Sequence, residues 1–283
     1  IGGVTGTNGK STTVSMIYQL LGLEGFKTGF ISTVQFDTGT GPVKNHYRQS
    51  TPEATEIHKI LYEMVINNCT HAVVEATSHG LSKRNNRLGS VQFDGAVFTN
   101  ITHEHLEFHK TLDRYVDDKA NLFRSLVPGK GFGIVNIDDK YSDRFRNSTN
   151  AVVFSYSTKV KNADIFAYDI KGTGKGAEFS VSFVNRIFNI GLNLPKIFNV
   201  ENSLAAILAA IKISSKDIEH FIPHMKKLIP AEGRMVTVNK GQPFSVLVDY
   251  AHSPGSFELL FPALREMTKG RLISVFGSAG ERD

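Results

Sequence analysis

The residues best suited to chemistry stand near the start of the chain, in the stretch Gly6, Thr7, Asn8, Gly9, Lys10, Ser11 and Thr12. This stretch follows a short apolar run and precedes a segment of helical periodicity, which is the context of a phosphate-binding loop. Lys10 would reach the outer phosphates, and the hydroxyl of Ser11 or Thr12 would hold Mg²⁺. The common pattern has one more glycine, at the position of Val4 here, so a plain glycine-rich turn is the alternative.

Glu75 and three histidines are the groups suited to a metal ion. Glu75 ends a buried apolar run, and a carboxylate at the end of a strand beside a phosphate loop is placed to ligate Mg²⁺ directly or through water. A solvated glutamate at a strand end is the alternative. His103, His105 and His109 follow another strand-like run, and such histidines are usually structural. The i,i+4 spacing of His105 and His109 leaves a zinc pair as a minor alternative.

A mostly parallel sheet must position these motifs. Strand-like segments alternate with helix-like ones through the first half of the chain, and this alternation predicts a parallel sheet with helices on both faces. The strand-like segments are residues 1–4, 28–33, 71–76, 95–100 and 131–137, and the helix-like ones are residues 11–23, 52–67 and 112–126. Short alternating runs over residues 151–194 then predict an attached antiparallel β-meander. Helices return at residues 199–213 and 215–228.

A domain boundary is expected where proline and glycine follow the last helix, in residues 229–235. We assign residues 1–232 to the first domain and residues 233–283 to the beginning of a second, Rossmann-like α/β domain. The second domain should open with a hairpin and a helix from Pro254, followed by a strand over residues 271–277. This part has only about 50 residues, so we expect it to be incomplete.

The composition argues against several classes of protein. The net charge of +5 comes from 32 basic and 27 acidic residues without a dense Lys/Arg run, so nucleic-acid binding has little support. A modest positive excess suits an anionic small substrate. Cys69 is the only cysteine, which fits a reducing compartment such as the cytoplasm. No apolar run reaches the ~18 residues of a membrane span, so we expect no membrane partner.

Taken together, the motifs resemble those of the Mur ligases, of the MurE type. They occur in the order and approximate spacing of that family: GVTGTNGKSTT, STPEATEI, VVEATSHGLS, FTNITHEHLEFHKTLDRYVDDKANLF, FNVENSLAA, GRM, VDYAHSPGSFE and GSAGERD. The resemblance covers nearly the whole chain, and the shorter phosphate loop is the normal form in this family. It implies a central ATP-binding domain followed by the start of the C-terminal domain, without the N-terminal domain that holds the uridine.

The resemblance implies an ATP- and Mg²⁺-dependent ligase of peptidoglycan synthesis. It would add diaminopimelate, lysine or ornithine to UDP-N-acetylmuramoyl-L-alanyl-D-glutamate. The substrate carboxylate attacks the γ-phosphate, and the incoming amine then displaces phosphate from the acyl phosphate. Because the reacting groups are anionic, Mg²⁺ and cationic side chains must offset their repulsion. We expect a cytoplasmic monomer. A folylpolyglutamate synthetase or a nucleotide-binding module without ligase activity are the alternatives.

The resemblance assigns five residues to the phosphates and the metal ions. Lys10 would bind the β- and γ-phosphates, and Ser11 and Glu75 would hold the first Mg²⁺. His105 matches the histidine of the family segment D-H-L-D-Y-H, here E-H-L-E-F-H, and would ligate the second Mg²⁺. Lys119 matches the family lysine that carries a carbamate, an anion that can bridge toward Mg²⁺ where an ammonium cannot.

The resemblance also assigns residues to the muramyl peptide and to the nucleotide. The peptide-binding residues implied are Ser50, Thr51, Pro52, Ser78 and Arg87. Arg84 competes with Arg87 because LSKRNNR is longer than the common pattern, and either guanidinium could clamp a carboxylate. Asn199 and Asn202 would contact the adenine. Arg234 would reach the ATP phosphates and Asp249 would lie near the ribose, both only in a closed form because they stand at the domain junction.

Lys119→Ala tests the carbamate. We expect the substitution to abolish ligase activity in the full-length protein, because the bridging anion is lost, and a short added carboxylate to restore part of it. Steady-state turnover with and without the carboxylate is the measurement. Full activity of the variant without any addition would exclude a carbamate at this position.

Overall fold

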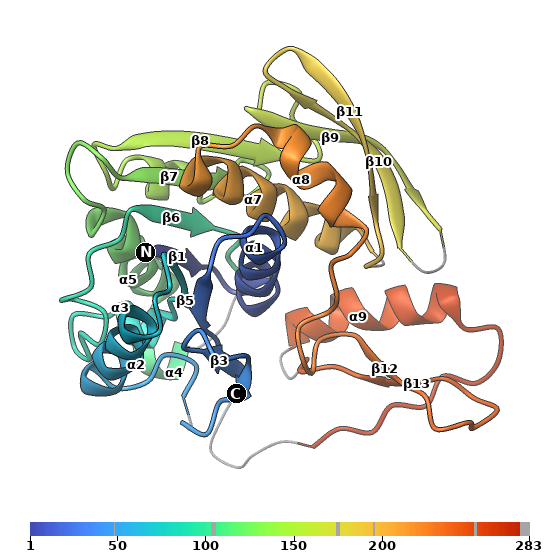
Figure 1. Cartoon of the computed structure of the whole chain (residues 1–283). Coiled ribbons are helices and arrows are strands. Elements are labelled where there is room, and N and C mark those ends of the chain that lie inside the picture. The colour runs from blue at the N-terminus through green and yellow to red at the C-terminus, as the bar shows by residue number, and fades with distance from the viewer. Residues whose placement is uncertain (48, 103–105, 174–175, 195, 252–253, 278–283) are drawn as a thin grey trace.

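The protein folds around one large mixed sheet with helices on both faces. A computed structural model describes residues 1–47, 49–102, 106–173, 176–194, 196–251 and 254–277, and it does not describe the side chains of residues 106, 107 and 259. Figure 1 shows the sheet and its helices as the main body, with a smaller unit of one helix and a two-stranded sheet beside it. The expected α/β class is therefore confirmed.

The large sheet has the order β11-β10-β9-β8-β7-β6-β1-β5-β2-β3-β4. From β2 to β9 in that order every pair is parallel, and the outer pairs on both sides are antiparallel. The strands are β1 Gly2–Thr5, β2 Thr28–Ile31, β3 Gln35–Asp37, β4 Val43–Lys44, β5 His71–Glu75, β6 Gly95–Phe98, β7 Phe132–Asn136, β8 Val152–Ser157, β9 Ile165–Gly172, β10 Ala177–Phe183 and β11 Arg186–Leu192. The small sheet pairs β12 Val236–Val238 with β13 Val246–Val248.

The helices cover the two faces of the large sheet and build two separate cores (Figure 1). One core joins the sheet to α1, α7 and α8, and the other joins it to α2, α3 and α5. Successive strand residues supply the two cores in turn, because side chains alternate along a strand: Val73 enters the first core and Val74 the second. The helices are α1 Lys10–Leu23, α2 Ala54–Ile66, α3 Ser78–Leu81, α4 Leu106–His109, α5 Leu112–Arg124, α6 Ser142–Arg146, α7 Ile197–Ser214, α8 Ile218–Met225 and α9 Pro254–Met267.

α7 is the central helix of the first core. By length and composition it is apolar enough to cross a membrane, which the expectation of no such apolar run had missed. In the described residues, however, 67% of this segment is buried inside the protein, against α1 and the sheet. Its small residues Ala205, Ala206, Ala209 and Ala210 are almost fully buried, and small side chains let two helices approach closely.

Two expectations about strands were wrong. The antiparallel meander does not begin at residue 151, because β8 pairs in parallel with both β7 and β9, and only β9, β10 and β11 form antiparallel pairs. The predicted strand over residues 271–277 is not formed: Ile273 and Val275 are 72% and 96% exposed. An apolar β-rich run becomes a strand only where a neighbouring strand takes up its backbone hydrogen bonds.

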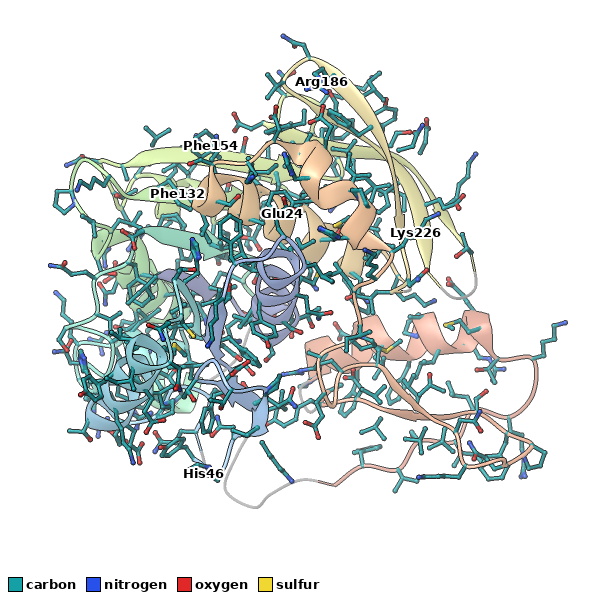
Figure 2. The ribbon with its side chains drawn as sticks, viewed as in Figure 1. Glu24, His46, Phe132, Phe154, Arg186 and Lys226 are labelled. Atoms are coloured by element: carbon teal, nitrogen blue, oxygen red, sulfur yellow. The ribbon has the colours of Figure 1, made fainter. Side chains whose placement is uncertain are left out.

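An ion-pair cluster joins the ends of α1 and α8. Glu24 accepts hydrogen bonds from His220 Nδ1 at 2.7 Å and His224 Nε2 at 3.1 Å, and Figure 2 labels Glu24 where α1 ends. Burial by itself would raise the pKa of Glu24, but the hydrogen bonds from the two histidines outweigh it and lower that pKa. A carboxyl group with a lowered pKa stabilises the folded state above its unfolded pKa, and this contribution is lost as the pH falls through the lowered value.

Glu24→Gln should therefore make stability less sensitive to acid. We expect the variant to unfold a few degrees lower than the natural sequence at neutral pH, and the difference to shrink as the pH falls below 4.5, the ordinary pKa of the group. Thermal unfolding followed over this pH range is the measurement. The control is Glu178→Gln, because Glu178 is an exposed residue of β10. If the dependence of stability on acid were the same in Glu24→Gln as in the natural sequence, the expectation would be contradicted.

Candidate active site

The loop between β1 and α1 has the shape of a phosphate-binding turn. Gly6 and Gly9 adopt φ values of 145° and 86°, which residues with a Cβ rarely adopt. A Cβ at Gly6 would overlap Thr99, and one at Gly9 would overlap the side chain of Asn202. Both positions therefore require glycine, and the free N–H groups at the start of α1 form a site that favours anions.

Residues after β6 hold this loop in place. The backbone N–H of Thr7 donates to Asn100 O at 2.7 Å and that of Asn8 donates to Asn100 Oδ1 at 3.0 Å. Thr99 Oγ1 donates to Asn8 O at 2.7 Å, and the hydroxyls of Thr7 and Tyr115 lie 3.0 Å apart. The sequence analysis missed these supports, although Asn100 ends a strand-like run. Because parallel strands end at the same edge of a sheet, the position of Asn100 after a strand could have predicted that it lies beside the loop.

Two lysines donate hydrogen bonds to backbone carbonyls of the loop. Lys10 Nζ donates to Thr7 O at 2.7 Å, and Lys119 Nζ donates to Gly6 O at 2.7 Å. Lys119 is only 1% exposed, and its Nζ also lies 4.5 Å from the centre of the Tyr115 ring. A solvated lysine on the surface of a helix, the ordinary expectation for α5, does not describe Lys119. The structure places Lys119 against the backbone of the loop.

A buried carboxylate stands across from these lysines. Glu75 is 1% exposed and accepts a hydrogen bond from Ser11 Oγ at 2.8 Å. It also accepts bonds from the N–H and the hydroxyl of Thr33, both at 2.9 Å. Arg234 Nη2 donates to the same Ser11 oxygen at 3.3 Å, and its guanidinium lies 4.6 Å from the centre of the Tyr250 ring. Ser11 thus connects the carboxylate to the residues near the domain junction.

These groups line one cavity of about 200 Å³ at the carboxyl edge of the sheet. Its wall contains many of the residues predicted for the phosphates, the metal ion and the peptide: Thr7, Asn8, Gly9, Lys10, Ser11, Thr12, Ser50, Glu75, Ser78, Lys119 and Arg234. Of the other predicted residues, Gly6, Thr51, Pro52 and Arg87 do not line it. His105, the predicted ligand of a second metal ion, lies outside the described residues. Within those residues, no cluster of three His, Cys, Asp or Glu side chains is arranged to hold a metal ion. The Ser11 hydroxyl and the Glu75 carboxylate still suit Mg²⁺, which keeps several waters and takes few protein ligands beside phosphate oxygens.

The predicted peptide-binding turn is tied to the same edge. Thr51 Oγ1 donates to Glu75 O at 2.9 Å and accepts from the N–H of Thr77 at 3.1 Å. Arg87 donates to Thr51 O at 3.1 Å and pairs with Glu53 at 2.7 Å, while Pro52 is buried beside them. Arg84 instead lies over the ring of Phe108 at 5.4 Å. Of the two arginines, Arg87 is therefore the one attached to the turn.

Ser78 belongs to a chain of hydrogen bonds that the sequence analysis did not foresee. Its hydroxyl lies 3.0 Å from His109 Nε2, and His109 Nδ1 lies 2.8 Å from Asp118 Oδ2. Because a carboxylate only accepts, Nδ1 carries the proton of the second bond. His109 is 3% exposed and both of its ring nitrogens are used, which argues against the zinc pair with His105.

The remaining predicted nucleotide residues lie in two places, at the start of α7 and at the domain junction. Asn202, at the start of α7, covers Gly9 and accepts from Thr13 Oγ1 at 3.4 Å, and Asn199 is 4% exposed one turn earlier. Asp249 accepts the backbone N–H groups of Met235 at 2.9 Å and Ala251 at 2.8 Å. Its carboxylate therefore fixes the backbone at the domain junction, and its predicted position near a ribose stays a prediction.

The parallel sheet and its short phosphate loop define a P-loop α/β protein. Residues 4–210 match the family model described as Mur ligase middle domain, and residues 233–283 match the one described as Mur ligase, glutamate ligase domain. The chain belongs to the Mur ligase family.

Curated relatives agree with this membership. The chain is 48% identical over 282 residues to a UDP-N-acetylmuramyl-tripeptide synthetase of Borreliella afzelii, covering 99% of this chain and 56% of the relative. It is 45% identical over 298 residues to the protein of the same name in Treponema denticola, again covering 99% of this chain and 56% of the relative. The chain thus spans about half the length of the curated relatives it matches.

Solved structures share the fold. A structure titled as a UDP-N-acetylmuramoyl-L-alanyl-D-glutamate--2,6-diaminopimelate ligase has a TM-score of 0.79 at 30% identity, covering 99% of this chain and 56% of that one. The folylpolyglutamate synthase of Mycobacterium tuberculosis has a TM-score of 0.73 at 16% identity, covering 94% of this chain and 66% of that one. At that identity the second likeness concerns the fold alone.

Glu75→Gln tests the carboxylate as a metal ligand. The amide has the same shape but no charge, so we expect ATP binding in the presence of Mg²⁺ to weaken by about tenfold or more. Binding without Mg²⁺ should change little. Calorimetric titration under both conditions is the measurement. Thr33→Val, which removes a donor to Glu75 but keeps the charge, is the matched control and should have a smaller effect. An equal loss with and without Mg²⁺ would contradict the metal role.

Proposed function

We propose that this chain is the ATP-binding part of a ligase that adds the third amino acid to UDP-N-acetylmuramoyl-L-alanyl-D-glutamate in the cytoplasm. The observation that carries the proposal is the cavity lined by the phosphate loop, Glu75, Lys119 and Ser50, with the next residue, Thr51, bonded to Glu75 O. Nucleotide binding alone requires neither a buried lysine behind the loop nor a peptide-binding turn at its edge. The names of the curated relatives support the same reaction.

In this proposal the loop residues hold and polarise the triphosphate. The N–H groups at the start of α1 bind phosphate oxygens, and Lys10 turns from Thr7 O toward the β- and γ-phosphates. Ser11 and Glu75 would hold Mg²⁺, which supplies charge neutralisation between the phosphates and the substrate carboxylate. Catalysis then consists mainly of positioning two anionic groups in line against their repulsion.

Lys119 would act as a carbamate. The ammonium group loses one proton to give the neutral amine, which adds to carbon dioxide and loses a second proton to form an N-carboxylate. The side chain thus changes from a cation to an anion with two protons released. The carbamate keeps one N–H group, which retains a donor for Gly6 O. A metal ion is the partner that offsets a buried anion at this depth, and His105 would complete its ligands.

The peptide would occupy the opposite end of the cavity. Ser50, Thr51 and Pro52 would contact the muramyl peptide, and Arg87 and Ser78 would bind its carboxylates. Asn199 and Asn202 would contact the adenine, with Asp249 near the ribose, when the second domain closes. We assign residues 1–232 to the ATP-binding domain and residues 233–283 to the glutamate ligase domain, and we propose a monomer.

The full-length protein provides the test. We expect ADP formation to require UDP-N-acetylmuramoyl-L-alanyl-D-glutamate together with diaminopimelate, lysine or ornithine, and Lys10→Ala to abolish it. Phosphate release and the mass of the product are the measurements. ATP hydrolysis that ignores the muramyl peptide would support a simple NTPase instead, and glutamate addition to a folate would support a folylpolyglutamate synthetase. Either result would overturn the proposal.

A further inference from the structure

The segment between α8 and β12, residues 226–235, is the linker that carries Arg234 to the phosphate loop. Two of its residues are bonded to the same helix. Arg234 reaches Ser11 in the first turn of α1, and Ile229 is held by Gln19 two turns further along. The linker therefore follows α1 from its middle to its N-terminal end.

Gln19 holds Ile229 with a pair of hydrogen bonds. Its Nε2 donates to Ile229 O at 3.0 Å, and its Oε1 accepts the N–H of Ile229 at 2.9 Å, so the side-chain amide acts as a neighbouring strand would. The second hydrogen of Nε2 faces Ser15 Oγ at 3.0 Å. Reversing the amide would place a donor against the N–H of Ile229, so the geometry admits one orientation only.

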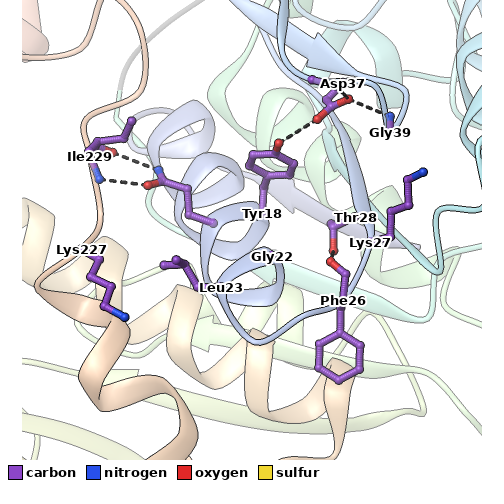
Figure 3. A pocket seen from close by; sticks show the side chains of 12 residues that line it. Tyr18, Gly22, Leu23, Phe26, Lys27, Thr28, Asp37, Gly39, Lys227 and Ile229 are labelled. Atoms are coloured by element: carbon purple, nitrogen blue, oxygen red, sulfur yellow. Dashed lines mark hydrogen bonds between the residues drawn. The ribbon is translucent and has the colours of Figure 1, made fainter.

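Side-chain packing does not fix Ile229. Its side chain is 66% exposed and borders a cavity of about 440 Å³ that also contains Tyr18, Leu23 and Lys227 (Figure 3). The dashed lines at Ile229 in Figure 3 are its two hydrogen bonds with the side chain of Gln19. Leu228, one residue earlier, is 2% exposed and packs in the core. The two bonds from Gln19 therefore fix the exposed backbone of Ile229 between two buried residues, Leu228 and Ala231, the latter 7% exposed.

The linker between Ile229 and Arg234 is short compared with the distance along α1 that it follows. Ser11 and Gln19 are separated by a helical rise of ~12 Å, whereas five residues of extended linker reach ~17 Å at most. The linker turns at Gly233, whose φ of 68° favours glycine, so little slack remains. The carbonyl of buried Ala231 accepts the N–H of Arg234 at 3.0 Å, so a shift of the Ile229 backbone passes through Pro230 to the turn that carries the guanidinium. A hydrogen bond between Arg234 and Ser11 tolerates only a small shift of that turn.

We infer that Gln19 is a positioning residue. By fixing the backbone of Ile229, it determines where the guanidinium of Arg234 lies over the phosphate loop. The same α1 that presents Lys10 and Ser11 to the phosphates also determines where the guanidinium from the domain junction arrives. The inference rests on the proposed function in one respect, namely that Arg234 contacts the bound nucleotide.

The test is a double-mutant cycle on the full-length protein with nucleotide affinity as the readout. Gln19→Leu keeps the size of the side chain and removes both bonds, so we expect Mg·ATP binding to weaken about tenfold. In an Arg234→Ala background the same substitution should cost nothing further, because it acts through Arg234. Ser15→Ala, which leaves both bonds to Ile229, is the matched control and should stay within about twofold of the natural affinity.

Two further measurements separate positioning from loss of folding. Gln19→Glu keeps the acceptor for the N–H of Ile229 but opposes its carbonyl with a carboxylate, and we expect a loss at least as large as in Gln19→Leu. Hydrogen exchange at Ile229 should accelerate in Gln19→Leu while the strands of the sheet stay protected. Additive losses in the cycle, or unchanged affinity in either Gln19 variant, would overturn the inference. Absence of ligase turnover would count against the proposed function alone, since nucleotide binding is measured independently of it.

Discussion

The hydrogen bonding of one buried carboxylate holds the site together. Glu75 ends strand β5 with almost no exposure to solvent, and a buried charge is tolerated only when hydrogen bonds or cations compensate it. Its oxygens take the Ser11 hydroxyl and both donors of Thr33, while its backbone carbonyl takes Thr51. A single residue thus joins the phosphate loop, the segment after β2 and the turn at Thr51.

The core of the protein serves this arrangement by fixing α1. The first turn of α1 must approach Asn202 of α7 so closely that Gly9 cannot carry a Cβ, and the alanines of α7 allow the two helices to pack at that distance. The far end of α1 is joined to α8 through Glu24 and its two histidines. The helix that presents the phosphate loop is therefore held at its first turn by α7 and at its far end by α8.

The sequence predicted most of the sheet and most of the cavity, for a physical reason. Buried parallel strands are continuous apolar runs, and the residues that follow them, such as Glu75, share one edge. The β8 pairing was missed because a short alternating run does not reveal the direction of its neighbour. The roles of Asn100 and His109 were missed because both depend on contacts between segments distant in the sequence. The short helix α3, which places Ser78, has too few residues to show a periodicity.

Two consecutive residues of α5 support different parts of the cavity wall. Lys119 bonds to the phosphate loop, and Asp118 orients His109 and through it Ser78. Neighbouring residues on a helix differ by about 100° in direction, so one backbone supports both parts from a common origin. α5 therefore works as a spacer of fixed length between the phosphate loop and Ser78. Because Asp118 and Lys119 share one backbone, any rigid shift or rotation of this helix moves both contacts together.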